Sequence, residues 1–164
     1  MARGDLTVDE IMVILPVTVG RLEELTASLT PARLRLSPGP GAWSINDVLA
    51  HLRACHDVLG GNMLRILRED RPTWRAMNPR TWMTQTDYPD WDFASALTAF
   101  SRQRAELLTV LEPLDAAAWS RTAGVTGLPG GMVERDVRYY GSWMAAHERA
   151  HVKHIARVAA AVAA

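Results

Sequence analysis

The sequence predicts an all-α protein, namely a four-helix bundle with two long connections. Apolar residues recur at helical spacing in four long segments, and clusters of proline and glycine separate these segments. No segment shows the strict apolar alternation of a half-buried strand, so we expect no sheet. The four predicted helices cover 7–29, 44–68, 92–113 and about 134 to the end of the sequence.

Size and composition are those of one globular domain. The chain has 164 residues, of which 48% are hydrophobic, so it can bury a substantial core, and we treat 1–164 as a single domain. Its 18 basic and 18 acidic residues cancel, and no run of basic residues builds a positive stripe. The charge therefore gives no support for nucleic-acid binding.

Cysteine usage and hydropathy predict a soluble, cytoplasmic protein. The lone cysteine, Cys55, cannot form an internal disulfide and suits a reducing compartment. Residues 1–10 include Asp5, Asp9 and Glu10 and lack the basic and apolar regions of a signal peptide. No apolar run approaches the roughly 20 residues that cross a bilayer, so we expect no membrane association.

The first two predicted helices begin with capping motifs. Thr7 followed by Glu10, and Ser44 followed by Asp47, both match the capping box, in which two side chains bind free amides at a helix start. Pro16 lies inside the first helix. Because proline lacks a backbone donor and crowds the preceding turn, it predicts a kink or a later helix start.

The segments between the helices are predicted to be irregular. Proline and glycine dominate 30–42, and 69–91 contains three tryptophans without a sustained period, so we expect at most one helical turn there. Residues 115–119 predict a short extra turn. In 124–131, Pro129 and several glycines exclude a helix and predict a loop with short extended pieces. A long connection such as 69–91 often carries function.

The five histidines fall in two segments, and their spacing separates candidate metal ligands from bystanders. His147 and His151 are four residues apart, which places both rings on one face of the fourth helix. His154, three residues further on, faces the same way. In the second helix, His56 lies five residues after His51 and points well round the helix. We therefore expect His56 on the surface.

His51 is the third candidate ligand. It lies among Val48, Leu49 and Leu52, and a neutral imidazole in such an apolar setting needs hydrogen-bond partners or a metal. A histidine from one helix that faces a spaced pair on another is a common way to build a metal site in a bundle. The simpler alternative is that these histidines are polar or core positions of amphipathic helices and bind no metal.

Three further residues lie at helical distance from the histidines and could line the same pocket: Cys55, Tyr140 and Trp143. Core packing is a sufficient explanation for each of them. Cys55 would be a fourth ligand only if the helices approach closely. Asp47, one turn before His51, could orient an imidazole, but its capping role already explains it.

The run HERAH at 147–151 matches the HExxH motif of zinc proteases, in which the glutamate activates water. We discount this match, because a protease needs strand edges for its substrate and a further ligand after the motif. Here the setting is helical and the third histidine lies far upstream. Glu148 points about 100° away from His147. Exposure, or a salt bridge to Arg149 or to a neighbouring helix, is therefore expected for Glu148.

Two segments together resemble the DinB-like superfamily, which includes YfiT-type and bacillithiol transferase proteins: WSINDVLAHL at 43–52 and HERAHVKHI at 147–155. The order of helices and loops along nearly the whole chain is similar as well. The resemblance implies a homodimer and, as cofactors, a divalent metal such as zinc or nickel and a low-molecular-weight thiol. It also implies the metal ligands, which are His51, His147 and His151.

Three neutral imidazoles leave coordination positions open, as in catalytic rather than structural zinc sites. Together with the resemblance, this favours a metal-dependent enzyme that acts on a small molecule, for example a thiol S-transferase or a hydrolase. The alternative is a non-catalytic metal-binding or stress-response protein that acts as a homodimer. In that case His154, where many relatives carry glutamine, or Cys55 would close the site as a fourth ligand.

Overall fold

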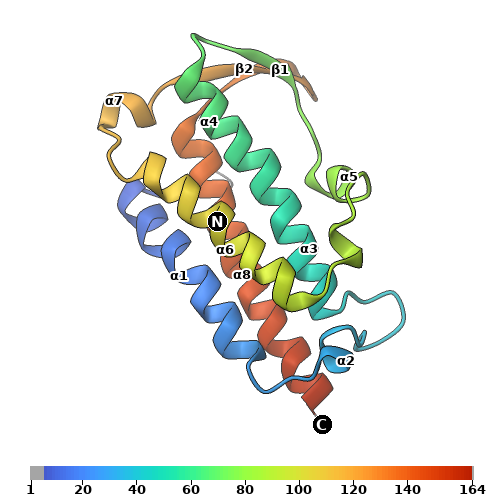
Figure 1. Ribbon diagram of the computed structural model, residues 1–164. Helices are drawn as coiled ribbons and strands as arrows, with labels where there is room; N and C mark the ends of the chain where they lie inside the picture. The colour runs from blue at the N-terminus through green and yellow to red at the C-terminus, as the bar shows by residue number, and fades with distance from the viewer. Residues whose placement is uncertain (1–5, 164) are drawn as a thin grey trace.

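Four long helical segments lie side by side in the computed structural model, which describes residues 6–163 (Figure 1). The all-α bundle prediction is confirmed. Residues 1–5, including Asp5 of the acidic start, and residue 164 of the predicted domain lie outside the described residues. The four segments are α1 (Val8–Thr26), the run of α3 (Ile45–Cys55), η1 (His56–Gly60) and α4 (Gly61–Arg68), α6 (Phe93–Leu111), and α8 (Val137–Ala163).

Both predicted capping boxes are present. The Thr7 hydroxyl accepts the Glu10 N–H at 3.2 Å and the Glu10 carboxylate accepts the Thr7 N–H at 2.8 Å, so α1 begins immediately after Thr7. Ser44 and Asp47 exchange the same pair of bonds before α3. Pro16 lies inside α1 without delaying its start. A delayed start was wrong because the capping box satisfies the first amides.

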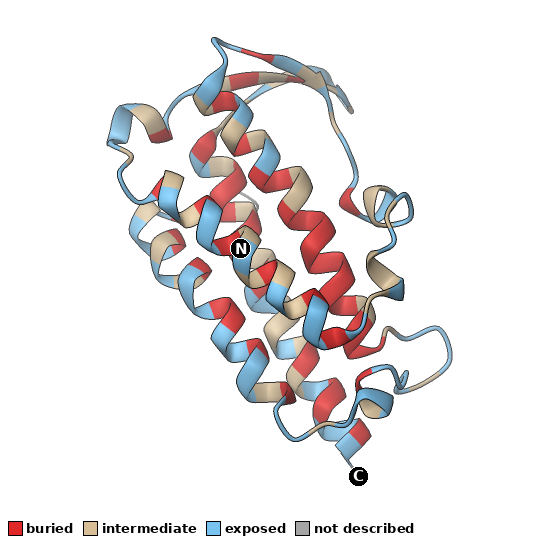
Figure 2. Cartoon of the chain, in the orientation of Figure 1, coloured by how far each residue is buried: buried red, intermediate tan, exposed pale blue. Residues whose placement is uncertain are grey.

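The second long segment contains a π-helical turn, η1, between α3 and α4. Apart from Asp47, the 11 residues of α3 are all buried, so this helix is covered almost all round (Figure 2). Its outer face is covered by α5 (Pro79–Met83) and the short 3-10 helix η2 (Tyr88–Asp90). The connection 69–91 thus contains more structure than the single predicted turn, and that structure packs on α3.

A three-stranded sheet lies over one end of the bundle, so the expectation of no sheet was wrong (Figure 1). β2 (Thr122–Leu128) pairs in parallel with β1 (Thr73–Arg75) on one side and antiparallel with β3 (Gly131–Asp136) on the other. β1 has only three residues, and in β2 only Ala123 and Val125 are buried, so the sequence shows little apolar alternation. Because β3 extends to Asp136, α8 begins three residues after the predicted start at Glu134.

The two remaining helices are short. α2 (Pro31–Leu34) lies in the proline-rich connection 30–42, and α7 (Ala116–Trp119) confirms the extra turn predicted for 115–119. Among the described residues no helix is both long and apolar enough to cross a membrane.

The apolar core falls into two clusters with a polar layer between them. The cluster nearer the sheet ends at Leu15 of α1 and Met144 and Ala145 of α8, and the other begins at Val19 and Ile155. Buried polar side chains fill the intervening level, with Thr18, His51, Arg104 and Glu148 all at most 4% exposed. The candidate metal centre belongs to this layer.

Candidate metal centre

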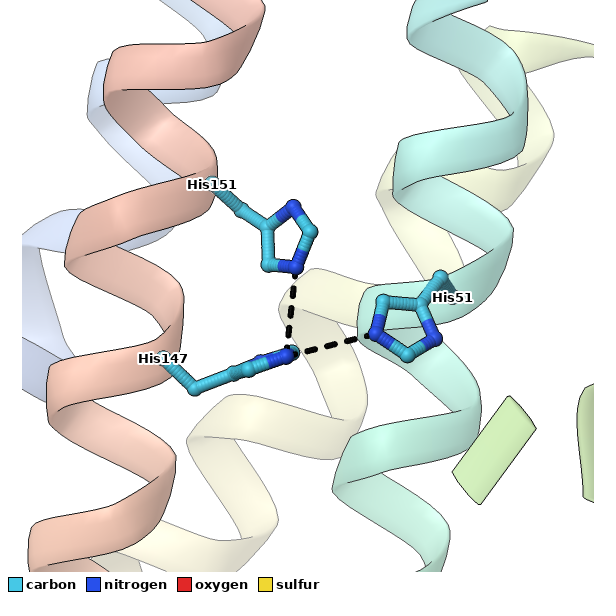
Figure 3. Close-up of side chains that lie close together, drawn as sticks. All are labelled: His51, His147 and His151. Atoms are coloured by element: carbon cyan, nitrogen blue, oxygen red, sulfur yellow. Dashed lines mark hydrogen bonds between the residues drawn. The ribbon is translucent and has the colours of Figure 1, made fainter. Parts of the chain in front are cut away.

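The structure brings together the three histidines that the sequence singled out, His51, His147 and His151, which we call the histidine cluster. His51 projects from α3, and the other two project from successive turns of α8 (Figure 3). His51 is only 3% exposed, while the α8 pair is half-buried. Helix packing and the four-residue spacing together make the three rings converge.

The nitrogen atoms of the histidine cluster have the spacing of metal ligands. The Nε2 atom of His147 lies 3.3 Å from Nε2 of His51 and 3.2 Å from Nε2 of His151. One ligand nitrogen from each ring can be chosen so that all lie within 4.8 Å of one another. Tetrahedral ligands at metal–nitrogen distances of 2.0–2.1 Å are about 3.3 Å apart. The two short nitrogen–nitrogen separations match this ligand–ligand distance.

Hydrogen bonding among neutral rings does not account for this geometry. A neutral imidazole nitrogen carries either a proton or a lone pair, so Nε2 of His147 can donate once or accept once. It nevertheless lies within hydrogen-bonding distance of two other Nε2 atoms. Only one of these contacts can be an ordinary hydrogen bond at any time. A cation that accepts three lone pairs satisfies all three nitrogens at once.

The environment keeps two of these rings neutral at physiological pH. Burial, aided by the nearby His147 ring and the charge of Arg80, lowers the pKa of His51 to about 4. Burial and the neighbouring imidazoles lower the pKa of His151 to about 3. A neutral imidazole is the form that binds a metal, so little proton competition is expected near pH 7.

Trp43 packs beside His51, and Arg80 in turn packs on Trp43. The Trp43 ring lies 5.0 Å from the His51 ring, centroid to centroid, and the Arg80 guanidinium lies 5.2 Å from the Trp43 ring. Sequence reasoning missed Arg80, which lies in α5 within the connection predicted as largely irregular. The WS pair at 43 and 44 was recognised as part of a motif, but the contact of Trp43 with His51 could not be read from it.

Cys55 lies beside His51 but does not converge with the other two histidines. Its sulfur is 3.4 Å from Nε2 of His51, and the residue is 3% exposed within the core cluster nearer the sheet. Burial, with a smaller contribution from Glu148, raises the pKa of the Cys55 thiol to about 12. The thiol is therefore protonated at neutral pH. Cys55 is a core residue in contact with the site.

The other two histidines lie outside the histidine cluster. The half-buried His154 ring is 6.0 Å from the His151 ring, centroid to centroid, one turn further along α8. His56 was expected on the surface but is only 8% exposed. It does point away from His51, as its spacing requires, but α6 covers that side and the His56 ring packs edge-on against Phe100. Burial lowers the pKa of His56 to about 3.

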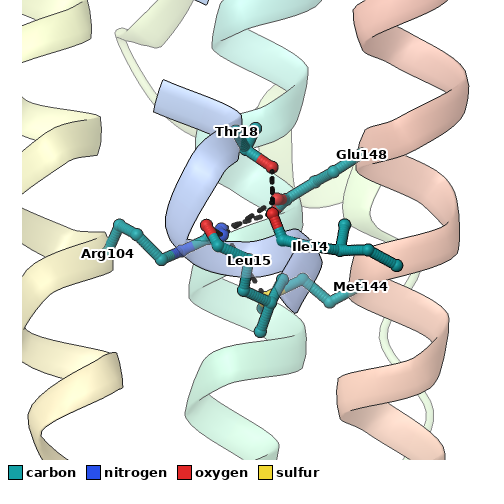
Figure 4. A network of polar contacts seen from close by, with 6 residues as sticks. All are labelled: Ile14, Leu15, Thr18, Arg104, Met144 and Glu148. Atoms are coloured by element: carbon teal, nitrogen blue, oxygen red, sulfur yellow. Dashed lines mark hydrogen bonds and ion pairs between the residues drawn. The ribbon is translucent and has the colours of Figure 1, made fainter. Parts of the chain in front are cut away.

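Glu148, the glutamate of the HERAH run, points towards α6 within the polar layer and is not part of the histidine cluster. Its carboxylate forms a buried ion pair with both terminal nitrogens of Arg104 on α6 (Figure 4). Arg104 also donates to the Leu15 carbonyl oxygen at 2.9 Å. Of the predicted alternatives, the salt bridge to a neighbouring helix is confirmed and exposure was wrong. A carboxylate used in this way is not placed to activate water at the histidines.

Tyr140 and Trp143, the other two residues expected near the histidines, lie on the side of the site nearer the sheet. Tyr140 is buried in the core cluster nearer the sheet, and Trp143 packs against that cluster from a half-buried position. Both line a cavity of about 360 Å³ between the sheet and α8. The histidines themselves are not part of its lining. Tyr140 is therefore a core residue, as the core-packing interpretation expected. Both Tyr140 and Trp143 also border this cavity.

Comparison with known proteins places the chain in a family. The sequence profile of the DinB superfamily matches residues 17–155, which is most of the chain. The protein therefore belongs to the DinB superfamily, as its two sequence segments suggested. No curated protein matches the sequence.

Two solved structures have a similar fold. YfiT from Bacillus subtilis, described as a probable metal-dependent hydrolase with an unusual four-helix bundle topology, matches with a TM-score of 0.76 and 18% identity over 96% of this chain and 90% of that one. TT2238, described as a four-helix bundle protein, matches with a TM-score of 0.62 and 20% identity over 90% of this chain and 97% of that one. At such identities the likeness establishes the fold.

Proposed function

We propose that this DinB-superfamily protein binds one divalent metal, zinc or nickel, through the histidine cluster and uses it as an enzyme on a small-molecule substrate. The observation that carries the proposal is the convergence of three Nε2 atoms at two separations of 3.2 and 3.3 Å. The description of YfiT as a probable metal-dependent hydrolase supports the same kind of chemistry. We place the protein in the cytoplasm, as a single domain.

The site is suited to an open, catalytic coordination sphere. A divalent metal held by three imidazoles would act as a Lewis acid and lower the pKa of a water molecule or thiol at its free position. The chain contributes three imidazole nitrogen ligands, with His51 buried beside the half-buried Trp43 ring and the α8 pair half-buried. Among metal-dependent reactions we favour S-transfer, in which a low-molecular-weight thiol loses its proton and its sulfur displaces a leaving group from an electrophilic small molecule.

A non-catalytic metal-binding or stress-response protein that acts as a homodimer is the second candidate. It is favoured by one contact, the 3.4 Å separation between the Cys55 sulfur and Nε2 of His51, since a thiolate there would close the coordination sphere. The raised pKa of Cys55 opposes this arrangement, because the thiol must lose its proton to become a ligand.

Elemental analysis of protein purified without an affinity tag tests the metal site. We expect about one divalent metal per chain, and its loss in a His147→Ala, His151→Ala double variant. His154→Ala, a histidine of the same helix outside the cluster, is the matched control and should retain the metal. Absence of metal from the wild-type protein even after reconstitution would overturn the proposal.

Turnover separates the two candidate functions. Metal-loaded protein is incubated with an electrophile such as 1-chloro-2,4-dinitrobenzene, with and without a small thiol such as cysteine. The thioether product and the hydrolysis product are both measured. Product formation that needs the thiol and is lost in the double variant supports S-transfer, whereas thiol-independent hydrolysis of an ester probe supports a hydrolase. No turnover in the metal-loaded protein with either class of probe supports the non-catalytic alternative.

A further inference from the structure

The cavity of about 360 Å³ between the sheet and α8 has the composition of a small-molecule site. It lies beside β2, β3 and the start of α5, and its volume is within the range of ligand pockets. Four aromatic side chains form much of its wall, and a single charged side chain, that of Arg135 on β3, joins them. Among the described residues that line the cavity, none is acidic. The aromatic residues are Trp74, Tyr139, Tyr140 and Trp143.

Arg135 is held in place by an aromatic ring and a backbone carbonyl, and no carboxylate of residues 6–163 forms an ion pair with it. Its guanidinium stacks on the Tyr139 ring at 4.4 Å, and one terminal nitrogen donates to the Glu134 carbonyl oxygen at 3.3 Å. Its Nε is buried and has no hydrogen-bond partner within the described part of the chain. The two neighbouring carboxylates bind elsewhere, Glu134 to Arg71 and Asp136 to the Tyr139 N–H. Arg135 therefore offers a positioned guanidinium to a ligand.

The cavity and the histidine cluster are adjacent along α8. Tyr139, Trp143, His147 and His151 follow one another at four-residue spacing, so each neighbours the next, with an offset of about 40° around the helix per step. The Tyr139 and Trp143 rings are 6.2 Å apart and the two histidine rings 4.4 Å apart, centroid to centroid. Each step of four residues rises about 6 Å. The cavity wall at Trp143 is thus one step from His147.

We propose that this cavity binds a small aromatic carboxylic acid, with its carboxylate on the Arg135 guanidinium and its ring against the aromatic wall. A planar fork of donors binds a carboxylate through two parallel hydrogen bonds, and aromatic walls favour a flat ligand. The remainder of the acid extends along α8 towards His147. The claim that such acids are the substrates of the enzyme rests on the proposed function. The claim that the cavity binds them can be tested without the metal.

Calorimetric titration with two matched probes tests the inference. 3-Phenylpropanoate carries the carboxylate, and 3-phenylpropanamide replaces it with a neutral group of similar shape. We expect the metal-loaded wild-type protein to bind the acid at least about tenfold more tightly than the amide. Arg135→Ala should abolish this preference and Arg135→Lys should retain part of it, because lysine keeps the charge but loses the fork. Arg102→Ala removes an exposed arginine on α6 and should change nothing.

The histidine double variant separates this inference from the proposed function. If His147→Ala, His151→Ala keeps the preference for the acid while Arg135→Ala loses it, the carboxylate site is at Arg135. The opposite pattern, or equal binding of acid and amide, or no binding of either probe, would overturn the inference. A wild-type protein that contains no metal but prefers the acid through Arg135 would overturn only the proposed function.

Discussion

At the scale of single residues, surroundings rather than residue type decide what each histidine does. The same imidazole is part of a converging trio at His51, packs against an aromatic ring at His56, and lies half-buried beyond the trio at His154. Spacing along the sequence was enough to select the histidine cluster, because four residues on a helix return to the same face. It could not show that α6 covers His56, since that depends on how the helices pack.

Cys55 gives a test of whether the site is open. Because the thiol is 3% exposed and its pKa is raised to about 12, we expect no reaction with a thiol reagent at pH 8 in the native protein and full reaction in denaturant. Cys55→Ala should retain about one metal per chain by elemental analysis. A native thiol that reacts only after metal removal, together with metal loss in Cys55→Ala, would instead identify Cys55 as a fourth ligand.

His56 predicts a pH dependence of stability. Its pKa falls from an ordinary value of 6.5 to about 3 on folding, so between these values the unfolded chain binds a proton that the folded chain does not. Stability is therefore complete above pH 6.5 and declines as the pH falls. At pH 5 the loss from this residue is about 2 kcal/mol relative to pH 7. In urea unfolding, the free energy of unfolding should fall less between pH 7 and pH 5 in His56→Gln than in the wild-type protein, by this amount.

His154→Gln is the control for that experiment, since it makes the same change in a half-buried ring of α8. Equal pH dependence in wild-type protein and His56→Gln would mean that His56 gains its proton in the folded state as well. In that case the burial of His56 would have no consequence for acid stability.

At the scale of secondary-structure elements, the buried ion pair between Arg104 and Glu148 joins α6 to α8 within the polar layer. Both residues are at most 2% exposed, and Arg104 also reaches the Leu15 carbonyl oxygen of α1. Three helices therefore meet at one guanidinium. Breaking a buried pair leaves an uncompensated charge and typically costs about 3–5 kcal/mol.

Glu148→Gln tests this role against that of a catalytic base. We expect the free energy of unfolding to fall by about 3 kcal/mol because Arg104 loses its counter-charge, while the metal content stays at one per chain. Replacing both residues, by Arg104→Met with Glu148→Leu, should recover much of the loss. Arg102→Ala, which removes an exposed pair with Glu106, should cost less than about 0.5 kcal/mol. Full stability of Glu148→Gln would contradict the structural role.

The sequence predicts the helices well because their signals are local. Capping boxes and a 3.6-residue period lie within each segment, and all four long helices appear close to their predicted bounds. The connection 69–91 is different. It is held by contacts to α3 and η1, where Arg53 stacks on the Tyr88 ring at 3.8 Å and Asp57 accepts hydrogen bonds from Trp82 and Tyr88. Such long-range contacts leave no periodic pattern.

The sheet and the cavity were not predicted because they too depend on contacts between segments far apart in the sequence. β1 is only three residues long and gains its partner, β2, from a segment about fifty positions later. One of the glycines that argued for a loop is needed by the sheet, since a Cβ at Gly124 would lie 3.0 Å from the Met132 sulfur. Arg135 therefore could not be recognised as a cavity residue before the sheet was known.

At the scale of the whole molecule, two apolar clusters stabilise the bundle on either side of the polar layer. The histidine cluster connects α3 with α8 across this layer, but neither apolar cluster contains a histidine. The bundle is thus expected to fold without metal, and bound metal is expected to add stability by linkage. The homodimer that the family resemblance implies remains a prediction. A measurement of the molecular mass in solution would test it.

Metal removal should lower the thermal stability without unfolding the protein at room temperature. At a free metal concentration about one hundred times the Kd, binding to the folded state alone adds about 2.7 kcal/mol. For a domain of this size that corresponds to a fall in Tm of roughly 5 to 10 °C on treatment with a chelator, measured by circular dichroism at 222 nm. The His147→Ala, His151→Ala variant should have the lower Tm with and without chelator. A wild-type Tm that does not respond to chelator or to added metal would show that the cluster binds no metal, whereas loss of helix at 25 °C would show that the metal is structural.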